Sequence, residues 1–248
     1  MSTTTWYSIF DFSFDYKGVE PSYIDPATQR WTADFEANFE SIRAELYHYL
    51  ENHQLQAYFN SAMVNNAKSW KTISLRWWDV QFAKNQQFFP KTMEIVNRYP
   101  EILSLSFNQL DAHGKILAHC GDTNAMYRCH LGIKIPATLP TTGFRVRDEK
   151  RSWEEGKWLI FMDAYNHEAW NDSDENRIIM VIDVLRPEWK NQRGKITSTV
   201  MSSLFLQKRA EMLPFLKKAP IWLIKLLAFS LRPLAWLAIR TVNFLRFY

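Results

Sequence analysis

Hydrophobic residues recur at different spacings in different parts of this chain. In residues 32–53 the apolar positions stand three or four apart, which predicts an amphipathic helix. Residues 70–78 (WKTISLRWW) are rich in aromatic and β-branched side chains and predict a strand. A second helix is predicted over residues 90–100, because proline is favoured at the start of a helix and a second proline ends it.

From about residue 102 the apolar residues come in short runs separated by turn sequences rich in Gly, Pro, Asn, Asp and Ser. The connections are too short for the crossovers that parallel strands need, so antiparallel pairing is predicted. We therefore expect a mainly β fold, a double-stranded β-helix (jelly roll) with flanking N-terminal helices and a C-terminal amphipathic helical tail. The predicted strands are residues 102–110, 115–119, 126–135, 143–148, 157–163, 167–170 and 177–185.

The composition is that of a folded protein with one main domain. Of the 248 residues, 47% are hydrophobic and 15% are aromatic, which is too apolar for a disordered chain. We expect an N-terminal strap (1–31), a jelly-roll domain (32–205) and a basic amphipathic tail (206–248). Two cysteines and no charged-then-apolar leader predict a reducing compartment, with the cytoplasm as the expected location. Seven glycines and no Walker loop or dinucleotide fingerprint argue against nucleotide chemistry.

The tail combines apolar residues with regularly spaced basic ones. After residue 205 Glu211 is the single acidic residue, and no apolar run beyond residue 214 exceeds seven residues, so a typical transmembrane segment is not expected. At about 100° per residue, the spaced cations keep within an arc of roughly 120°. This pattern suits a helix lying in a membrane interface, and residues 214–248 are expected to make peripheral contact with the inner face of a membrane. Helices packed on protein are the alternative. The spaced cations are Lys218, Lys225, Arg232, Arg240 and Arg246.

The stretch HCGDTNAMYRCH, which begins at His119, concentrates candidate ligands. A zinc site using both of its cysteines and both of its histidines is disfavoured, because neighbours on a strand point to opposite faces. Alternation instead places Arg128 and His130 on one face and Cys129 on the other, with Cys120 and Cys129 as wall residues. If the face with Arg128 points into the barrel, the buried guanidinium needs an anion, which a carboxylate ligand would supply.

A second fragment repeats this layout. His167 precedes Arg177 by ten residues, much as His119 precedes Arg128 by nine. Two histidines and two arginines in one small barrel suggest a metal with an anionic co-ligand. Imidazoles suit iron, zinc, copper or nickel, and a carboxylate-bearing cosubstrate suits non-haem iron in an oxygenase.

Several segments together resemble the aspartyl/asparaginyl β-hydroxylase family of iron(II)- and 2-oxoglutarate-dependent dioxygenases. They are RCHLGIKIP, RSWEEGKWLIFMDAYNHEAWNDSDENRIIMVIDVLRPE and, upstream, FEANFESIRAEL, WKTISL and PKT, and the likeness covers roughly residues 32–190. The resemblance implies that His119 and His167 are the catalytic iron ligands. It further implies that 2-oxoglutarate is held by Arg128, His130 and Arg177.

One position departs from the family's complete metal triad. Members with that triad carry Asp two residues after the first histidine, whereas this chain has Gly121. The family's animal peptide hydroxylases also have Gly there and work with two histidines plus water. Asp122 is a candidate third metal ligand. Asn108 and Trp77 are the nearest candidates for two further family positions that touch the cosubstrate.

The resemblance implies hydroxylation of a C–H bond with O2 while 2-oxoglutarate is decarboxylated to succinate. An acyl chain of a membrane lipid is the favoured substrate because the tail suits a membrane, and an Asp or Asn side chain of a peptide or protein is the alternative that Gly121 favours. A non-catalytic ligand-binding barrel is a third interpretation. Nucleic acid is not an expected partner, since the four bases in residues 145–155 are interleaved with four acids.

Overall fold

The computed structural model of the chain describes residues 4–8, 16–58, 60 and 63–246. Parts of the predicted strap and the last two residues of the predicted tail therefore lie outside the described residues, and so does the side chain of Arg246.

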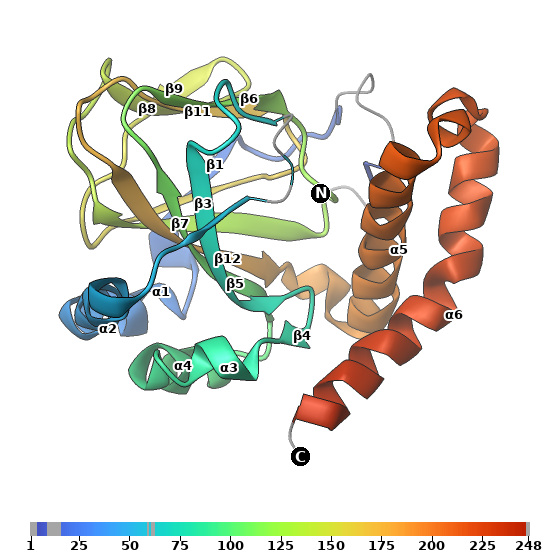
Figure 1. Cartoon of the computed structure of the whole chain (residues 1–248), viewed down its shortest axis with the longest axis horizontal. Helices are drawn as coiled ribbons and strands as arrows, with labels where there is room; N and C mark the ends of the chain where they lie inside the picture. Colours follow the sequence, from blue (N-terminus) through green and yellow to red (C-terminus); the bar gives the residue numbers. More distant parts are fainter. Residues whose placement is uncertain (1–3, 9–15, 59, 61–62, 247–248) are drawn as a thin grey trace.

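Two antiparallel β-sheets form the body of the protein (Figure 1). The larger sheet has the strand order β1-β10-β7-β12-β5-β3-β2, with β4 beside β3, and the smaller has the order β6-β11-β8-β9. The prediction of a mainly β jelly roll is confirmed. The strands are β1 (Tyr23–Ile24), β2 (Gln56–Ala57), β3 (Trp70–Trp77), β4 (Val80–Gln81), β5 (Ile102–Leu110), β6 (Gly114–His119), β7 (Met126–Lys134), β8 (Thr142–Val146), β9 (Glu149–Arg151), β10 (Trp158–Phe161), β11 (His167–Asn171) and β12 (Arg177–Leu185).

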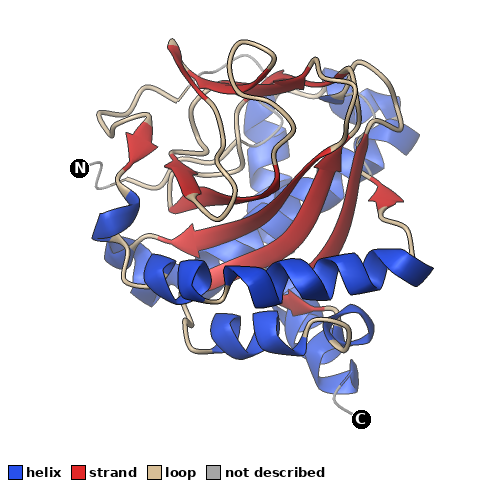
Figure 2. Ribbon diagram, turned by 90° about the vertical axis from the view of Figure 1, so that its left-hand side faces the viewer, coloured by secondary structure: helices blue, strands red, loops and turns tan. Residues whose placement is uncertain are grey.

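The helices form two groups. Figure 2 shows the first group as a layer beneath the long strands of the larger sheet, and Figure 1 shows α5 and α6 side by side at another flank of the molecule. The helices are α1 (Thr32–Ala37), α2 (Phe39–Asn52), α3 (Ala83–Gln86) and α4 (Pro90–Asn97) in the layer, and α5 (Arg193–Met212) and α6 (Ile221–Arg246) at the flank.

Side-chain alternation gives the larger sheet one apolar and one polar face. On β7, Cys129 and Leu131 are fully buried in the core that the sheet shares with the first group of helices. Arg128 and His130 point to the other face, which lines a cavity between the sheets. The predicted split between Arg128 and Cys129 is therefore confirmed, and Cys120 and Cys129 are both free thiols.

Two helices differ from the expectation. The helix predicted over residues 32–53 is interrupted at Asn38, whose backbone (φ −107°, ψ 13°) leaves the helical region between α1 and α2. Its side-chain Nδ2 donates to the Asp34 carbonyl oxygen at 2.7 Å. Helix α5 was not predicted, and the expected domain boundary at residue 205 falls inside it.

Helix α6 packs on α5 along one face, where Ile224 and Ala228 meet Leu206 and Ala210. Pro233 lies inside this helix, which is continuous from Ile221 to Arg246. By length and average composition, Ile221–Phe244 could cross a membrane, although Lys225, Arg232 and Arg240 interrupt it. The expectation that the tail is not a typical transmembrane segment stays a prediction.

Candidate active site

A cavity of about 280 Å³ lies between the two sheets. Its lining comes from strands of both sheets and includes buried and half-buried side chains. Asp122 is not among the residues that line it. The other seven predicted site residues line the cavity: Trp77, Asn108, His119, Arg128, His130, His167 and Arg177.

Two histidines meet where β6 ends and β11 begins. His119 and His167 pair across these strands, with ring centroids 4.2 Å apart. Each Nδ1 lies 2.7 Å from a backbone carbonyl oxygen two residues earlier, of Leu117 and of Tyr165. A carbonyl can only accept, so each Nδ1 carries the proton and each Nε2 keeps a free lone pair, as a metal ligand requires.

Both imidazoles are neutral at ordinary pH. Burial, with a smaller contribution from the Arg128 charge, lowers the pKa of His119 to about 4, although the hydrogen bond to the Leu117 carbonyl oxygen opposes this shift. The pKa of His167 is held well below its usual range by burial and by His119. No proton therefore competes for either Nε2 near neutral pH.

A buried carboxylate that was not predicted from the sequence lies beside His167, although it is not among the residues that line the cavity. Asp163 comes from the turn between β10 and β11, and its Oδ1 lies 3.7 Å from His167 Nε2. A Cβ added at Gly121 would lie 1.7 Å from Asp163 Oδ2, so the glycine leaves the space that this carboxylate fills. Burial raises the pKa of Asp163 to about 7, although Arg128 opposes the shift. The only sequence signal was an Asp four residues before His167.

Asp122 belongs to the same acidic neighbourhood. Burial raises its pKa to about 6, with Arg128 lowering it and Asp183 raising it. Among the described residues, only Asp163 has a carboxylate within 4 Å of a ring nitrogen of His119 or His167. Ligation by Asp122 stays a prediction.

The two predicted arginines have different environments. Arg128 pairs with Asp183 (Nε to Oδ1, 2.7 Å) and with Asp163 (Nη1 to Oδ1, 2.8 Å). Arg177 is 1% exposed, and within the described part of the chain its Nε and Nη2 have no hydrogen-bond partner. Burial lowers the pKa of Arg177 to about 9, so it still carries its charge at neutral pH. An unpaired buried cation calls for an anion, and Arg177 is the residue placed to receive one.

Trp153 orients the groups around Arg177. The guanidinium carbon lies 4.5 Å from the Trp153 ring centroid, and Trp153 Nε1 donates to His130 Nδ1 at 3.2 Å. Because Nδ1 accepts this bond, the proton of the neutral His130 ring sits on Nε2, which makes that atom a donor. Trp153 was not among the site residues predicted from the sequence.

The remaining predicted residues lie along the larger sheet. Asn108 on β5 accepts from Trp70 Nε1 at 3.1 Å and donates to Ser106 Oγ at 2.8 Å. Trp77 ends β3 at the half-buried side of the cavity, near Phe82.

The donor set suits a metal that keeps open coordination positions. In the described part of the chain, no group of three His, Cys, Asp or Glu side chains is arranged to hold a metal ion. The two histidine Nε2 atoms are available, and neither buried oxygen of Asp163 has a well-aligned hydrogen bond. Two imidazoles and one adjacent carboxylate are ligand types that suit iron(II) in oxygenases, with water or cosubstrate in the other positions.

Comparison with known proteins gives the family. A family model described as Aspartyl/Asparaginyl beta-hydroxylase matches residues 36–187. The chain belongs to this family. The sequence resemblance over roughly residues 32–190 is thereby confirmed.

Curated relatives in the family are hydroxylases. Ornithine lipid ester-linked acyl 2-hydroxylase of Rhizobium tropici is 31% identical over 192 residues, which cover 75% of this chain and 68% of the relative. Aspartyl/asparaginyl beta-hydroxylase of Homo sapiens is 34% identical over 113 residues, which cover 43% of this chain and 14% of the relative. The chain thus spans only a small part of the human protein. These relatives support an enzyme of the hydroxylase type.

Among solved structures, a Pseudomonas putida prolyl-4-hydroxylase matches with a TM-score of 0.43 and 12% identity, over 62% of this chain and 87% of that one. A predicted oxalate decarboxylase from Thermotoga maritima matches with a TM-score of 0.36 and 8% identity, over 54% of this chain and 95% of that one.

Proposed function

We propose that this protein is an iron(II)- and 2-oxoglutarate-dependent dioxygenase that hydroxylates a C–H bond on the acyl chain of a membrane lipid. One observation carries the reaction class: a single cavity holds two neutral histidines with free Nε2 atoms and a buried arginine that has no acidic partner among the described residues. The first pair suits a metal, and the arginine suits a carboxylate cosubstrate.

The predicted site residues that line the cavity, and Asp163 beside them, each have a role in this proposal. His119 and His167 would hold iron(II), which when bound supplies the activation of O2 as 2-oxoglutarate is oxidised to succinate and CO2. Asp163 would accept a hydrogen bond from a water beside the metal. Arg128 fixes the Asp163 carboxylate through their ion pair and adds positive charge to the cosubstrate side.

At the other end of the cavity, Arg177 and His130 Nε2–H would bind the distal carboxylate of 2-oxoglutarate. A guanidinium and an N–H donor give that carboxylate charge-assisted hydrogen bonds in a site shielded from water. Asn108 and Trp77, farther along the larger sheet, would contact the cosubstrate or the substrate.

Two observations support a lipid substrate: the share of this chain that aligns with a lipid hydroxylase, and the exposed surface of the C-terminal helix. The ornithine lipid hydroxylase aligns over 75% of this chain, whereas the human peptide-type relative aligns over 43%. Helix α6 also exposes large apolar side chains, which suit peripheral binding at the inner face of a membrane. The alternative is a peptide or protein Asp or Asn side chain, which the glycine at position 121 favours.

The test is an assay of purified protein with iron(II), 2-oxoglutarate and O2. Ornithine lipid in mixed micelles and an Asp/Asn-containing peptide are offered separately, and mass spectrometry reads the gain of one oxygen. We expect oxygenated lipid with succinate formed in equal amount, and loss of both in His119→Ala and His167→Ala but not in the exposed control His113→Ala. Hydroxylated peptide with untouched lipid would overturn the lipid assignment. Absence of succinate with either substrate would favour the non-catalytic barrel.

A further inference from the structure

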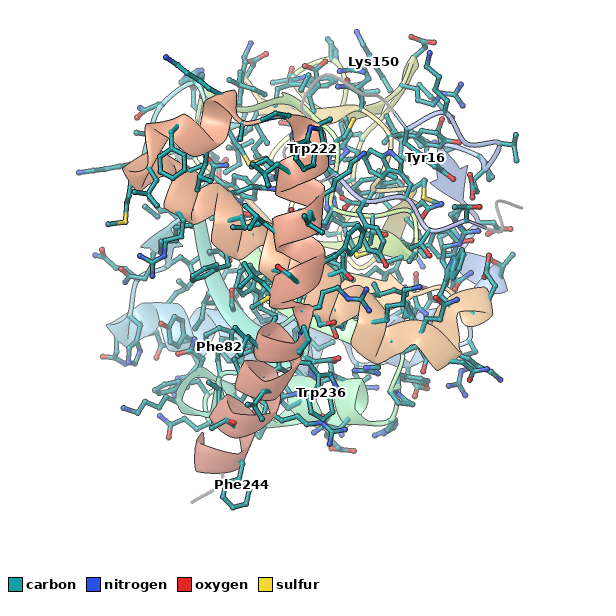
Figure 3. All side chains as sticks on the ribbon, turned by 90° about the vertical axis from the view of Figure 1, so that its right-hand side faces the viewer. Tyr16, Phe82, Lys150, Trp222, Trp236 and Phe244 are labelled. Atoms are coloured by element: carbon teal, nitrogen blue, oxygen red, sulfur yellow. The ribbon has the colours of Figure 1, made fainter. Side chains whose placement is uncertain are left out.

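The side of α6 that faces away from α5 is apolar and exposed. Its outward positions recur every three or four residues, opposite the face through which Ile224 and Ala228 pack on α5. Figure 3 shows Trp222, Trp236 and Phe244 on this side of the molecule. An exposed stripe of this length marks a contact surface. We call it the α6 outer face, and it consists of Trp222, Leu226, Phe229, Pro233, Leu237 and Phe244.

The charges beside this face select its partner. Lys225 and Arg240 are exposed on α6, Lys218 is exposed in the turn just before it, and the sequence of α6 contains no acidic residue. The Arg240 guanidinium carbon lies 4.1 Å from the Trp236 ring centroid, so charge and aromatic surface occur together. Tryptophans, aliphatic side chains and cations without acids match an anionic lipid surface, where apolar groups enter the acyl boundary and cations meet the headgroups.

The C-terminal end of α6 is hydrogen-bonded to the segment between Trp77 and Phe82. Asn243 Oδ1 accepts from the Gln81 backbone N–H at 2.9 Å, and its Nδ2 donates to the Asp79 carbonyl oxygen at 2.8 Å. Trp77 and Phe82, which flank this turn, line the cavity and are half-buried. This part of the cavity lining therefore lies beside the end of α6.

The view in Figure 3 supports a common orientation. Phe82 lies beside the lower half of α6 in this view, on the same side of the molecule as Trp236 and Phe244. Packing of α6 against β4, which connects Trp77 to Phe82 across the turn, agrees with the picture.

We propose that the α6 outer face docks on an anionic lipid bilayer and that the Asn243 contact holds the cavity opening between Trp77 and Phe82 at that surface. The docked opening admits an acyl chain lifted from the bilayer, a step that rests on the proposed lipid function. The docking itself does not depend on the reaction, on iron or on 2-oxoglutarate.

Fluorescent labels on single introduced cysteines test the orientation. In a Cys120→Ser background, an environment-sensitive probe is placed at exposed Ser230 on α6, at exposed Lys84 beside Phe82, or at exposed Glu51 on α2 at the opposite side in Figure 1. Vesicles of phosphatidylcholine with phosphatidylglycerol are added. We expect rising, blue-shifted emission from the probes at positions 230 and 84 and no change at 51. A response at 230 alone would overturn the placement of the opening, and a response at none would overturn the docking.

Substitutions test the surface and the fixing contact. Trp222→Ser with Phe229→Ser should weaken binding to these vesicles by at least about tenfold, because two apolar side chains no longer enter the lipid. Tyr47→Ser, an exposed aromatic on α2, is the matched control and should bind as the parent does. Equal binding by the double variant, or a concentration-dependent dimer that vesicles do not dissociate, would overturn the bilayer as partner.

Asn243→Ala should preserve vesicle binding and reduce the response of the probe at position 84, whereas the exposed neighbour Thr241→Ala should change neither. An unchanged probe response in Asn243→Ala would overturn the role of that contact. If vesicles bind as expected but no lipid gains oxygen, the proposed substrate is wrong and the docking stands.

Discussion

The two ends of β12 each present a buried arginine, and their surroundings are opposite. Arg186, directly after the strand, is 0% exposed and pairs with Glu20 (Nη1 to Oε1, 2.9 Å) and Glu188. Its Nη1 also donates to the Asn124 carbonyl oxygen at 2.8 Å. Arg177, the first residue of the strand, is 1% exposed, lies on the Trp153 ring and has no acidic partner among the residues that the structure describes.

The contrast separates a structural charge from a functional one. Burial of a charge is costly, and pairing offsets that cost within the protein itself. At the Arg186 end, the ion pair with Glu20 ties the N-terminal segment to the sheet, so this arginine contributes to the fold. At the Arg177 end the free-energy cost of burying the charge is not offset when no ligand is bound, and a bound anion would offset it.

The largest effect is expected at the structural end. Arg186→Met leaves Glu20 buried beside Tyr16 with its cation gone, which should lower the free energy of unfolding by about 3–5 kcal/mol. Urea titration followed by circular dichroism measures it. The double variant Glu20→Gln/Arg186→Met should recover much of the loss. A loss below about 1 kcal/mol in the single variant would remove the structural role.

The functional end should respond in binding and not in stability. Arg177→Met removes an unpaired buried charge, so its unfolding free energy should stay equal or rise. Its affinity for 2-oxoglutarate should fall by about 2–5 kcal/mol, roughly thirtyfold to several thousandfold, as for truncation of a buried charged partner. Anaerobic calorimetric titration measures this, with exposed Lys150→Met as the control. Unchanged affinity in Arg177→Met would contradict the comparison.

A smaller effect is expected from the residue that orients the Arg177 end. Trp153→Phe keeps an aromatic ring against Arg177 but removes the donor to His130 Nδ1, so KM for 2-oxoglutarate should rise about 2- to 12-fold with little change in kcat. Trp158→Phe is matched, because it also loses one buried hydrogen bond, from Nε1 to the Thr32 carbonyl oxygen, on the helix side of the sheet. Equal KM changes in both variants would indicate a general packing effect.

The sequence predicted those site features that depend on local periodicity. Strand alternation placed Arg128 and His130 on one face and Cys129 on the other, because successive side chains on a strand point to opposite faces. Asp163 could not be found this way. It approaches His167 and fills the space beside Gly121 only through the turn after β10, which is a tertiary arrangement.

The missed helix α5 has a different physical reason. Its first half is rich in Ser and Thr, which favour other conformations and break the apolar stripe expected of a buried helix. In the structure the hydroxyls of Ser198, Thr199 and Ser202 donate within the helix, each at 2.7 Å to the carbonyl oxygen four residues earlier. These bonds allow polar side chains to be buried without an outside partner, so hydrophobic periodicity gave no signal.

The smallest effect concerns pH and separates the two ends of β12 once more. Burial alone would raise the pKa of Glu20, but hydrogen bonds from Arg186 and Tyr16 outweigh it and hold the pKa below 4.5. Because the folded pKa is the lower one, the stability from Glu20 is present above pH 4.5 and is lost as the pH falls through the folded pKa. Thermal unfolding from pH 7 to pH 3 should therefore show a shrinking difference between the parent and Glu20→Gln. Arg177→Met should run parallel to the parent over this range, since Arg177 stays protonated throughout. A convergence of Arg177→Met with the parent at low pH would show that Arg177 is also paired with a titrating acid and would end the contrast.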